Sequence, residues 1–357
     1  MKTVEKKLNI AVPYDLRRIG DPETLLFFDI ETTGFSPSSS MLYLIGCLYF
    51  RGGEAHFVQW LACGLSEETE VLGAFLHLAS GFGTLVHYNG DTFDLRYLQG
   101  LADQYRIVTP FDRLRSFDIL KKVRAVRTLL QLENCRLKTV ERFLGICRED
   151  LYSGGELIDV YREYLESRDP GRERLLLLHN EEDILNLPGL LPVLEYADFL
   201  NDPAFADVSS GFSEDGTVLQ VSAETPYTFP CRTALTATAG IRILLEGHRL
   251  LAEIPVTRGT MKTFYQNYRD YYYLPEEDTA IHKRLAQYVD KPHRVPATPR
   301  TACTRVTGVF LPARKGLDLP VFTEDYKTGA PQVLYREEYL PEYLAALVFG
   351  LRSPAVS

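Results

Sequence analysis

The chain has 357 residues, 45% hydrophobic and 24% charged, a composition ordinary for a globular protein and a length that accommodates two domains. No stretch approaches the roughly 20 apolar residues of a membrane-spanning helix, and the charged N-terminus lacks the apolar segment of a signal peptide, so we expect a cytoplasmic protein with no membrane partner. Its formal net charge of −9 argues against nonspecific coating of duplex nucleic acid, which needs a basic surface.

The first 200 residues predict an α/β domain. Residues 1–20 look like a polar N-terminal arm, and residues 25–30 form a short apolar run typical of a buried central strand. Further strands are expected at residues 41–50, 55–61 and 84–87, and helices at residues 67–79, after Asp91, at 137–144 and at 172–187, where Pro188 should end the last one. This order of elements indicates a mixed sheet flanked by helices, extending over residues 21–200.

The composition changes after residue 200. Residues 201–215 are polar and contain glycine and serine, which is typical of a linker between domains. Beyond the linker we expect a smaller α+β domain of unknown role at residues 216–357, with a hairpin across residues 241–256 and a helix at residues 276–289.

Tyrosines and basic residues alternate in this second domain. Tyr265, Tyr268 and residues 271–273 lie close in the chain to Lys262 and Arg269. Such side chains stack on the bases of single-stranded nucleic acid, but tyrosines are also common in the packing of ordinary sheets. The sequence leaves both interpretations open.

Several common chemistries have no matching motif. No Walker A loop and no GxSxG elbow occurs, and the six cysteines include no CxxC pair. Four of the cysteines have apolar neighbours, which suits reduced and buried thiols. A P-loop phosphotransferase, a hydrolase with a serine elbow, a zinc ribbon and a disulfide framework are therefore disfavoured.

The acidic residues Asp29 and Glu31 end the first apolar strand, in the string LLFFDIETTG. Residues i and i+2 of a strand face the same side, so both carboxylates point one way. Carboxylates gathered in one place repel each other unless cations neutralise them, and oxygen ligands suit Mg²⁺ or Mn²⁺. The pattern indicates a metal site, although acids also end strands without any such role.

Two later segments carry acids beside apolar runs. Asp94 lies at an expected helix start, where it is either a site residue or a favourable first-turn acid with Asp91 as the cap. His179 and Asp183 are four residues apart and share one face of an expected helix. They could act as a base and a metal ligand, or belong to a salt-bridging acidic face.

Taken together, the three segments resemble the exonuclease motifs of the DEDD 3′–5′ exonuclease superfamily. The matching strings are DIETTG, HYNGDTFDLRYL and HNEEDILNL, and the resemblance covers about residues 20–200. Within that superfamily, the chain is similar to the YprB-type ribonuclease-H-like branch. The resemblance implies a ribonuclease-H-like mixed sheet for the first domain.

The resemblance also implies roles for individual residues. Asp29 would bridge two divalent ions, Mg²⁺ or Mn²⁺, and Glu31 would hold one of them. Asp94 would contact the second ion, often through water, and Asp183 would complete the ligand shell of the first ion. His179 would position or deprotonate the attacking water.

Three further residues are candidates for substrate contacts, and one spacing departs from the superfamily pattern. Thr32, Thr33 and Asn89 could contact a terminal nucleotide, while Asp118 is expected to start a helix. The histidine subgroup places its histidine five residues before the aspartate, and the tyrosine subgroup uses four. Here His179 has the tyrosine spacing, so either it replaces that tyrosine or the helix is placed slightly differently.

The leading hypothesis is a two-metal-ion phosphodiesterase, a 3′–5′ exonuclease that degrades single-stranded DNA or RNA from its 3′ end. The alternative is a noncatalytic nucleic-acid- or protein-binding module that retains the fold. The presence of all four acids favours the first hypothesis. Directionality comes from the resemblance alone, and the sequence does not choose between DNA and RNA.

Overall fold

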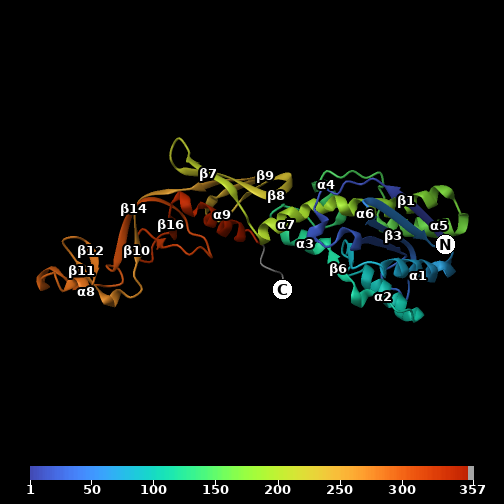
Figure 1. The fold of residues 1–357 in the computed structure, drawn as a ribbon, viewed down its shortest axis with the longest axis horizontal. Helices are drawn as coiled ribbons and strands as arrows, with labels where there is room; N and C mark the ends of the chain where they lie inside the picture. The colour runs from blue at the N-terminus through green and yellow to red at the C-terminus, as the bar shows by residue number, and fades with distance from the viewer. Residues whose placement is uncertain (353–357) are drawn as a thin grey trace. The chain divides into compact units, whose positions relative to one another are not determined.

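A computed structural model describes residues 1–352, which form two compact units (Figure 1). The first unit is Met1–Ala197 and the second begins at Asp198, so the boundary falls within α7 (Leu194–Asn201). None of the helices among residues 1–352 is long and apolar enough to cross a membrane.

The described residues of the N-terminal unit form one six-stranded mixed sheet. β2 lies inside it, antiparallel to β3 and parallel to β5, with residues of β2 buried on both faces. In spatial order the strands are β1 (Lys2–Leu8), β4 (Glu54–Leu61), β3 (Leu42–Arg51), β2 (Leu25–Thr32), β5 (Thr84–His87) and β6 (Arg115–Asp118).

Helices cover both faces of this sheet. On one face, Phe28 and Ile30 of β2 pack with α1 (Glu68–Ala79) and α2 (Asp94–Tyr105). On the other, Tyr43 packs with side chains of the later helices α5 and α6. The remaining bounds in this unit are α3 (Ile119–Val126), α4 (Leu137–Phe143), α5 (Gly154–Ser167) and α6 (Pro170–Leu190). The mixed, helix-flanked sheet predicted from the sequence is confirmed.

Two predictions for this unit need correction. Residues 2–8, expected to belong to a polar arm, form the edge strand β1 and pair with β4. Helix α6 is longer than predicted, since Asp169 caps it at Pro170 and it continues past Pro188 to Leu190. Proline removes the hydrogen bond to the carbonyl of Ile184, and burial of Leu187 and Leu190 on either side of it stabilises the last turn of the helix.

The C-terminal unit is β-rich and, within its described residues, contains three small sheets. Their strands, in spatial order, are β7 (Ala206–Phe212), β8 (Val218–Thr236) and β9 (Arg242–Pro255) in the first; β10 (Thr257–Phe264), β14 (Cys303–Pro312), β16 (Gln332–Leu334) and β15 (Val321–Phe322) in the second; and β12 (Thr279–His282), β11 (Tyr271–Leu274) and β13 (Val295–Pro296) in the third. Two helices accompany them, α8 (Lys283–Ala286) and α9 (Leu340–Phe349).

Three sequence-based expectations differ from this unit. The hairpin expected across residues 241–256 is instead the single strand β9, because its backbone pairs with β8 from Arg242 to Pro255. Residues 206–212, expected within a linker, form β7 because their backbone pairs with β8. The helix expected at residues 276–289 is instead strand β12 followed by the single turn α8. Pairing of Thr279–His282 with the tyrosines of β11 outweighs the helix-start signal of the preceding acids.

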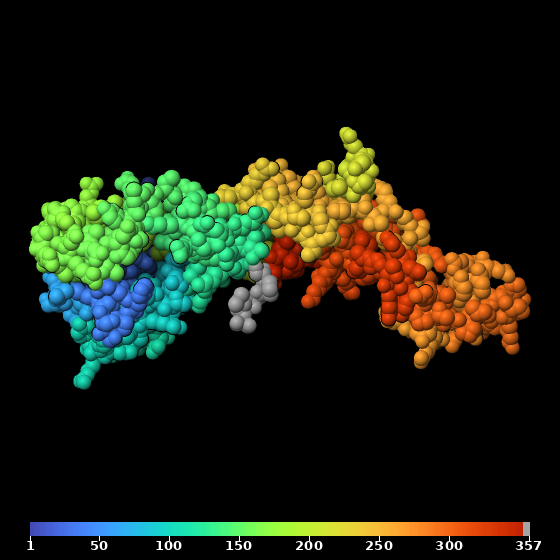
Figure 2. Space-filling model, turned by 180° about the vertical axis from the view of Figure 1, so that it is seen from behind, coloured from blue at the N-terminus to red at the C-terminus, as the bar shows by residue number. Residues whose placement is uncertain are grey.

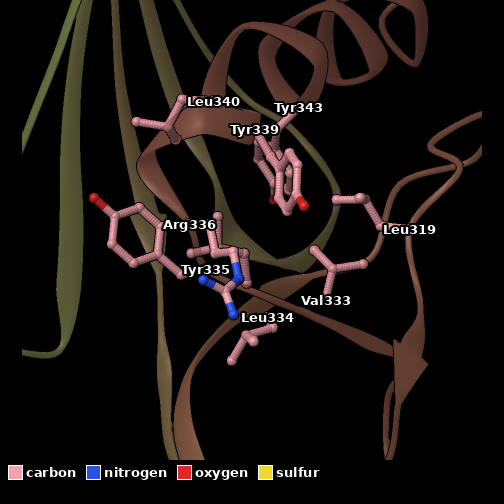
Figure 3. Close-up of a pocket in the computed structure, with 9 residues that line it drawn as sticks. Leu319, Val333, Leu334, Tyr335, Arg336, Tyr339, Leu340 and Tyr343 are labelled. Carbon is pink, nitrogen blue, oxygen red and sulfur yellow. The ribbon is translucent and has the colours of Figure 1, made fainter.

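A small pocket lies in this unit between β16 and α9 (Figure 3). Leucine, valine and tyrosine side chains line most of it, and Arg336 is its one charged lining residue. Tyr343 at its edge donates a hydrogen bond to the carbonyl of Pro312 at 2.9 Å. The pocket offers no carboxylate, so it lacks the chemistry predicted from the acidic motifs.

Candidate metal centre

The first two acids lie on one face of β2, as the strand periodicity predicts. Asp29 accepts a hydrogen bond from Asn180 of α6 at 3.3 Å, and Glu31 also faces α6. The neighbouring residues Phe28 and Ile30 point to the opposite face. Glu31 is only 8% exposed, and a buried carboxylate is costly unless a positive charge neutralises it.

A tightly bonded turn places Asp94 at the first residue of α2. The Gly90 N–H donates to Nδ1 of His87 at 3.0 Å, and the Asn89 N–H donates to Asp118 at 2.9 Å. The next turn closes when the Leu95 N–H donates to the carbonyl of Gly90 at 2.9 Å. Asp94 is 5% exposed, so this turn buries its carboxyl group against β2.

Asp91 does not cap α2, contrary to the sequence-based expectation. Its carboxylate accepts a hydrogen bond from Ser116 and pairs with Lys121. Asp118, in contrast, caps α3 through the Leu120 N–H at 3.0 Å, which confirms the predicted helix-start role. Asp91 therefore ties the turn to α3 and β6 and leaves Asp94 as the acid that faces the sheet.

Helix α6 brings His179 and Asp183 to the same place. The imidazole Nε2 of His179 lies 3.4 Å from Oε1 of Glu31 and 3.4 Å from Oδ2 of Asp183. One ligand atom from each of these three residues lies within 4.8 Å of the others. The helix approaches closely because β3 presents Gly46, where a Cβ atom would lie 2.2 Å from Oδ1 of Asn180.

The electrostatics of the site show that its acids are near one another. Burial first, then Asp183, Asp94 and Glu31, raise the pKa of Asp29 well above its usual range. Burial and the charges of Asp183 and Asp94 likewise raise the pKa of Glu31. Burial raises the pKa of Asp94 to about 7. In the metal-free protein, the positive charge near these carboxylates does not neutralise them.

Two charged residues that the sequence analysis missed complete the surroundings of His179. Nδ1 of His179 lies 2.7 Å from Oδ2 of Asp150, and Nη2 of Arg148 lies 2.5 Å from Oδ1 of Asp183. Arg148 also pairs with Glu141 at 3.0 Å. Both residues lie between α4 and α5, where no periodicity marks them, and the run of charged residues Arg148-Glu149-Asp150 is the one available signal.

The predicted substrate residues bond within their own turns. Thr32 donates to the carbonyl of Gly34 at 2.7 Å, and Oγ1 of Thr33 accepts from the Met41 N–H at 2.8 Å. Asn89 has a positive φ of 69° and its side chain accepts from Thr92. These bonds shape the loops beside the acids, and contact of these residues with a nucleotide stays a prediction.

The donor set suits hard divalent cations. Glu31 and Asp183 contribute carboxylate oxygens that converge with the imidazole of His179, and Asp29 and Asp94 add further carboxylates coupled to them. Oxygen-rich sites of this kind fit Mg²⁺ or Mn²⁺. The pKa values of these carboxyl groups are raised, as expected for metal ligands without a cation. The positive charge of a bound cation would lower them.

The match to a family model agrees with the fold. Residues 26–194 match the model of the RNase_H superfamily. Matching solved structures include a family B DNA polymerase from the hyperthermophilic archaeon Pyrobaculum calidifontis (13% identity, TM-score 0.38, 72% of this chain and 39% of the polymerase chain) and a nuclease in its apo form (18% identity, TM-score 0.32, 53% of this chain and 77% of the nuclease chain). The chain thus spans well under half of the polymerase. No curated protein matches the sequence.

The N-terminal unit therefore has a ribonuclease-H-like fold. The conclusion rests on the superfamily match and on the mixed sheet with its flanking helices. The acids lie on β2, at the start of α2 and on α6. The match ends at residue 194, close to the end of the first compact unit at Ala197.

Proposed function

We propose that the chain is a metal-dependent nuclease of the DEDD type, a 3′–5′ exonuclease acting on single-stranded DNA or RNA. The observation that supports the proposal is the convergence of three distant segments on one buried site. Glu31, His179 and Asp183 lie within 4.8 Å of one another, and Asp29 and Asp94 are electrostatically coupled to them.

Four carboxylates would hold the metal in this proposal: Asp29, Glu31, Asp94 and Asp183. Two bound Mg²⁺ or Mn²⁺ ions would supply charge stabilisation for the entering hydroxide and the leaving 3′ oxygen. Asn180 fixes Asp29, and Arg148 binds one oxygen of Asp183 so that the other faces His179. The protein thereby orients its acids before any ion arrives.

His179 is the proposed general base. Its Nδ1 is held by Asp150 at 2.7 Å, which leaves Nε2 directed at the carboxylates of Glu31 and Asp183. When Nδ1 of an imidazole donates to a carboxylate in this way, Nε2 is the atom that can accept a proton from water. The four-residue spacing to Asp183 is thus compatible with a histidine that faces the site.

Degradation of oligonucleotides labelled at either end, with Mg²⁺ or Mn²⁺, tests the proposal. We expect loss of nucleotides from the 3′ end, and loss of this activity by at least 10³-fold in Asp29→Asn and Asp183→Asn. Asp103→Asn, an exposed acid on α2, is the control and should retain full activity. A folded protein that binds metal but cuts no oligonucleotide would instead be the noncatalytic binding module.

A further inference from the structure

The charge of the chain is unevenly distributed, and one part of the C-terminal unit is strongly basic. Residues 279–305 contain six lysines or arginines and one aspartate, in a chain whose net charge is −9. This segment comprises β12, α8 and β13 and runs into β14 (Figure 1). A local excess of positive charge in an acidic protein points to a polyanionic ligand.

The positive side chains on and after α8 are exposed. Lys283, Arg284 and Lys291 are all open to solvent, and none of the three forms an ion pair with a carboxylate among the described residues. Of the acids nearby in the chain, Glu276 pairs with His293 at 3.1 Å and Asp278 with Arg305 at 2.7 Å, whereas Asp290 is exposed next to Lys291. The three cations are therefore available to phosphate groups.

An exposed aromatic ring lies between these cations in the chain. Tyr288 is 82% exposed, and its N–H donates to the carbonyl of Leu285 in the turn after α8. A ring left in solvent beside cations is the arrangement on which bases of an unpaired strand stack. A duplex hides its base faces, so the exposed ring favours single strands.

Cation–π contacts and a hydrogen bond attach α8 to the neighbouring sheet. Two cations lie over the ring of Tyr272 on β11: Nζ of Lys283 is 6.0 Å and Cζ of Arg294 is 5.1 Å from its centroid. Arg294 also donates to the carbonyl of Ala286 at the end of α8. These contacts fix α8 on the small sheet β12-β11-β13, so the cations project from an ordered support.

We infer that Lys283, Arg284, Tyr288 and Lys291 form a binding surface for single-stranded nucleic acid, the α8 surface, in which the cations contact phosphates and Tyr288 stacks on a base. Figure 2 shows this part of the chain in orange. The inference rests on the proposed function only for its choice of ligand, and it assigns substrate binding to the unit outside the RNase_H match.

Fluorescence anisotropy tests the α8 surface with the full-length Asp29→Asn protein in EDTA, so that no cleavage occurs. The probes are a labelled dT20, a labelled rU20 and a 20-base-pair duplex, each titrated between 50 and 200 mM salt. We expect Lys283→Gln, Arg284→Gln and Lys291→Gln together to weaken binding at least tenfold. The same variant should lower the slope of log K against log salt by about 2, since each single-strand phosphate contact contributes about 0.7.

A control variant removes the same charge elsewhere in the unit: Arg232→Gln, Lys315→Gln and Lys327→Gln, all exposed. It should lose less than threefold in affinity. Tyr288→Ala should weaken single-strand binding about tenfold with the salt slope unchanged, and Tyr288→Phe should restore it. The stronger ligand of dT20 and rU20 identifies the sugar that the surface prefers.

Equal losses in the α8 and control variants would overturn the inference. So would binding of anionic phospholipid vesicles, sensitive to the α8 substitutions, by a protein that binds neither oligonucleotide, because the surface would then recognise a membrane. Binding is measured without catalysis, so absence of nuclease activity in the wild-type protein would refute the proposed function and leave this test intact. Unchanged melting temperatures of the variants confirm that they fold.

Discussion

Carboxylates contact both ring nitrogens of His179, and their distances indicate which nitrogen carries the proton. Asp150 contacts Nδ1 at 2.7 Å, whereas Glu31 and Asp183 lie 3.4 Å from Nε2. A carboxylate at 2.7 Å accepts the Nδ1 proton, so the lone pair of a neutral ring resides on Nε2. Asp150 is therefore a positioning residue, which acts on the reaction through His179.

Replacing Asp150 with asparagine tests this role. We expect kcat of the nuclease reaction to fall roughly 10–100-fold with little change in KM, because partners behind a site residue typically contribute that much. Steady-state kinetics over pH 5–9 provide the measurement, and the pH profile should also change shape. Glu149→Gln, an exposed acid next in the chain, should leave kinetics unaltered. Equal behaviour of the two variants would remove Asp150 from the mechanism.

Arg148 holds the acids of α4, α6 and the intervening loop together. Its guanidinium is nearly buried and contacts Glu141 at 3.0 Å, Asp183 at 2.5 Å and Glu182 at 3.5 Å. Burial opposes its charge, but Asp183 and Glu141 raise the pKa of Arg148 above its usual value. The side chain is thus a fixed cation beside the proposed metal ligands.

Arg148→Gln should lower the free energy of unfolding by about 3–5 kcal/mol, because removing one partner of a buried ion pair leaves the other charges uncompensated. Arg142→Gln is the matched control, since Arg142 is exposed and its pair with Glu133 at 3.6 Å should contribute less than about 1 kcal/mol. Urea denaturation of both variants gives the two values. Similar losses in the two proteins would show that the acids around Arg148 are neutralised by other means.

At the scale of elements, the site depends on how closely α6 approaches the sheet. A Cβ atom on Gly46 would lie 2.2 Å from Asn180 and 2.8 Å from Ile184, both on α6. Gln59 of β4 donates to Asn180 at 2.9 Å, and Asn180 in turn reaches Asp29. Hydrogen bonds therefore join α6 to β2 and β4 directly behind the acids, and Gly46 of β3 leaves the space for them.

Gly46→Ala should destabilise the protein by about 1–3 kcal/mol, the usual cost of overpacking a core. It should also weaken Mn²⁺ binding at least tenfold, because the added methyl group would displace α6 and move Asp183 away from β2. Thermal denaturation and Mn²⁺ titration monitored by electron paramagnetic resonance measure the two effects. Gly73→Ala, in α1 with open space around it, should instead gain up to about 1 kcal/mol and bind Mn²⁺ normally. A stable Gly46→Ala protein with unchanged metal affinity would contradict the argument.

Elements with a strong local pattern could be predicted from the sequence. The strands expected at residues 41–50, 55–61 and 84–87 are confirmed because each combines an apolar run with turn residues at its ends. Strand β1 could not be predicted, since KTVEKKL is an exposed edge strand that exists through pairing with β4, from Lys2 with Leu61 to Leu8 with Ala55. Its polar sequence does not by itself predict a strand, because the pairing with β4 is what makes it one.

The same distinction applies to the site. Asp29 and Glu31 could be placed on one face because strand periodicity is local, and His179 and Asp183 because helix periodicity is local. Asp150 and Arg148 could not, because the path of residues 144–153 outside regular structure brings Asp150 to His179 and Arg148 to Asp183. Their role depends on tertiary contacts that no spacing in the chain encodes.

At the scale of the whole molecule, the buried acids make stability depend on protons and cations. Burial raises the pKa of Asp94 from 3.8 to about 7 in the metal-free protein, and burial together with neighbouring charges raises those of Asp29 and Glu31. A carboxyl group with a raised pKa binds its proton more tightly when the protein is folded. The stability it contributes is present below about pH 4 and is lost as pH rises to about 7.

The metal-free protein should therefore melt at a lower temperature at pH 8 than at pH 5.5, and Asp94→Asn should reduce that difference. Each unit of raised pKa corresponds to about 1.4 kcal/mol, so the change at Asp94 is on the order of 2–4 kcal/mol at pH 8. Differential scanning calorimetry in EDTA measures it. Asp103→Asn, exposed on the same helix, should melt like the wild-type protein at both pH values.

Addition of Mn²⁺ should reverse this pH dependence, because the ion binds only the deprotonated carboxylates. At pH 8 an ion concentration of 100 times Kd stabilises a site by about 2.7 kcal/mol, whereas at pH 5.5 protons compete and the gain shrinks. Asp94→Asn should show a smaller gain at pH 8 than the wild-type protein. A melting temperature that Mn²⁺ leaves unchanged at both pH values would mean that the acids gathered at β2, α2 and α6 form no metal site, and the nuclease mechanism proposed for them would fail with it.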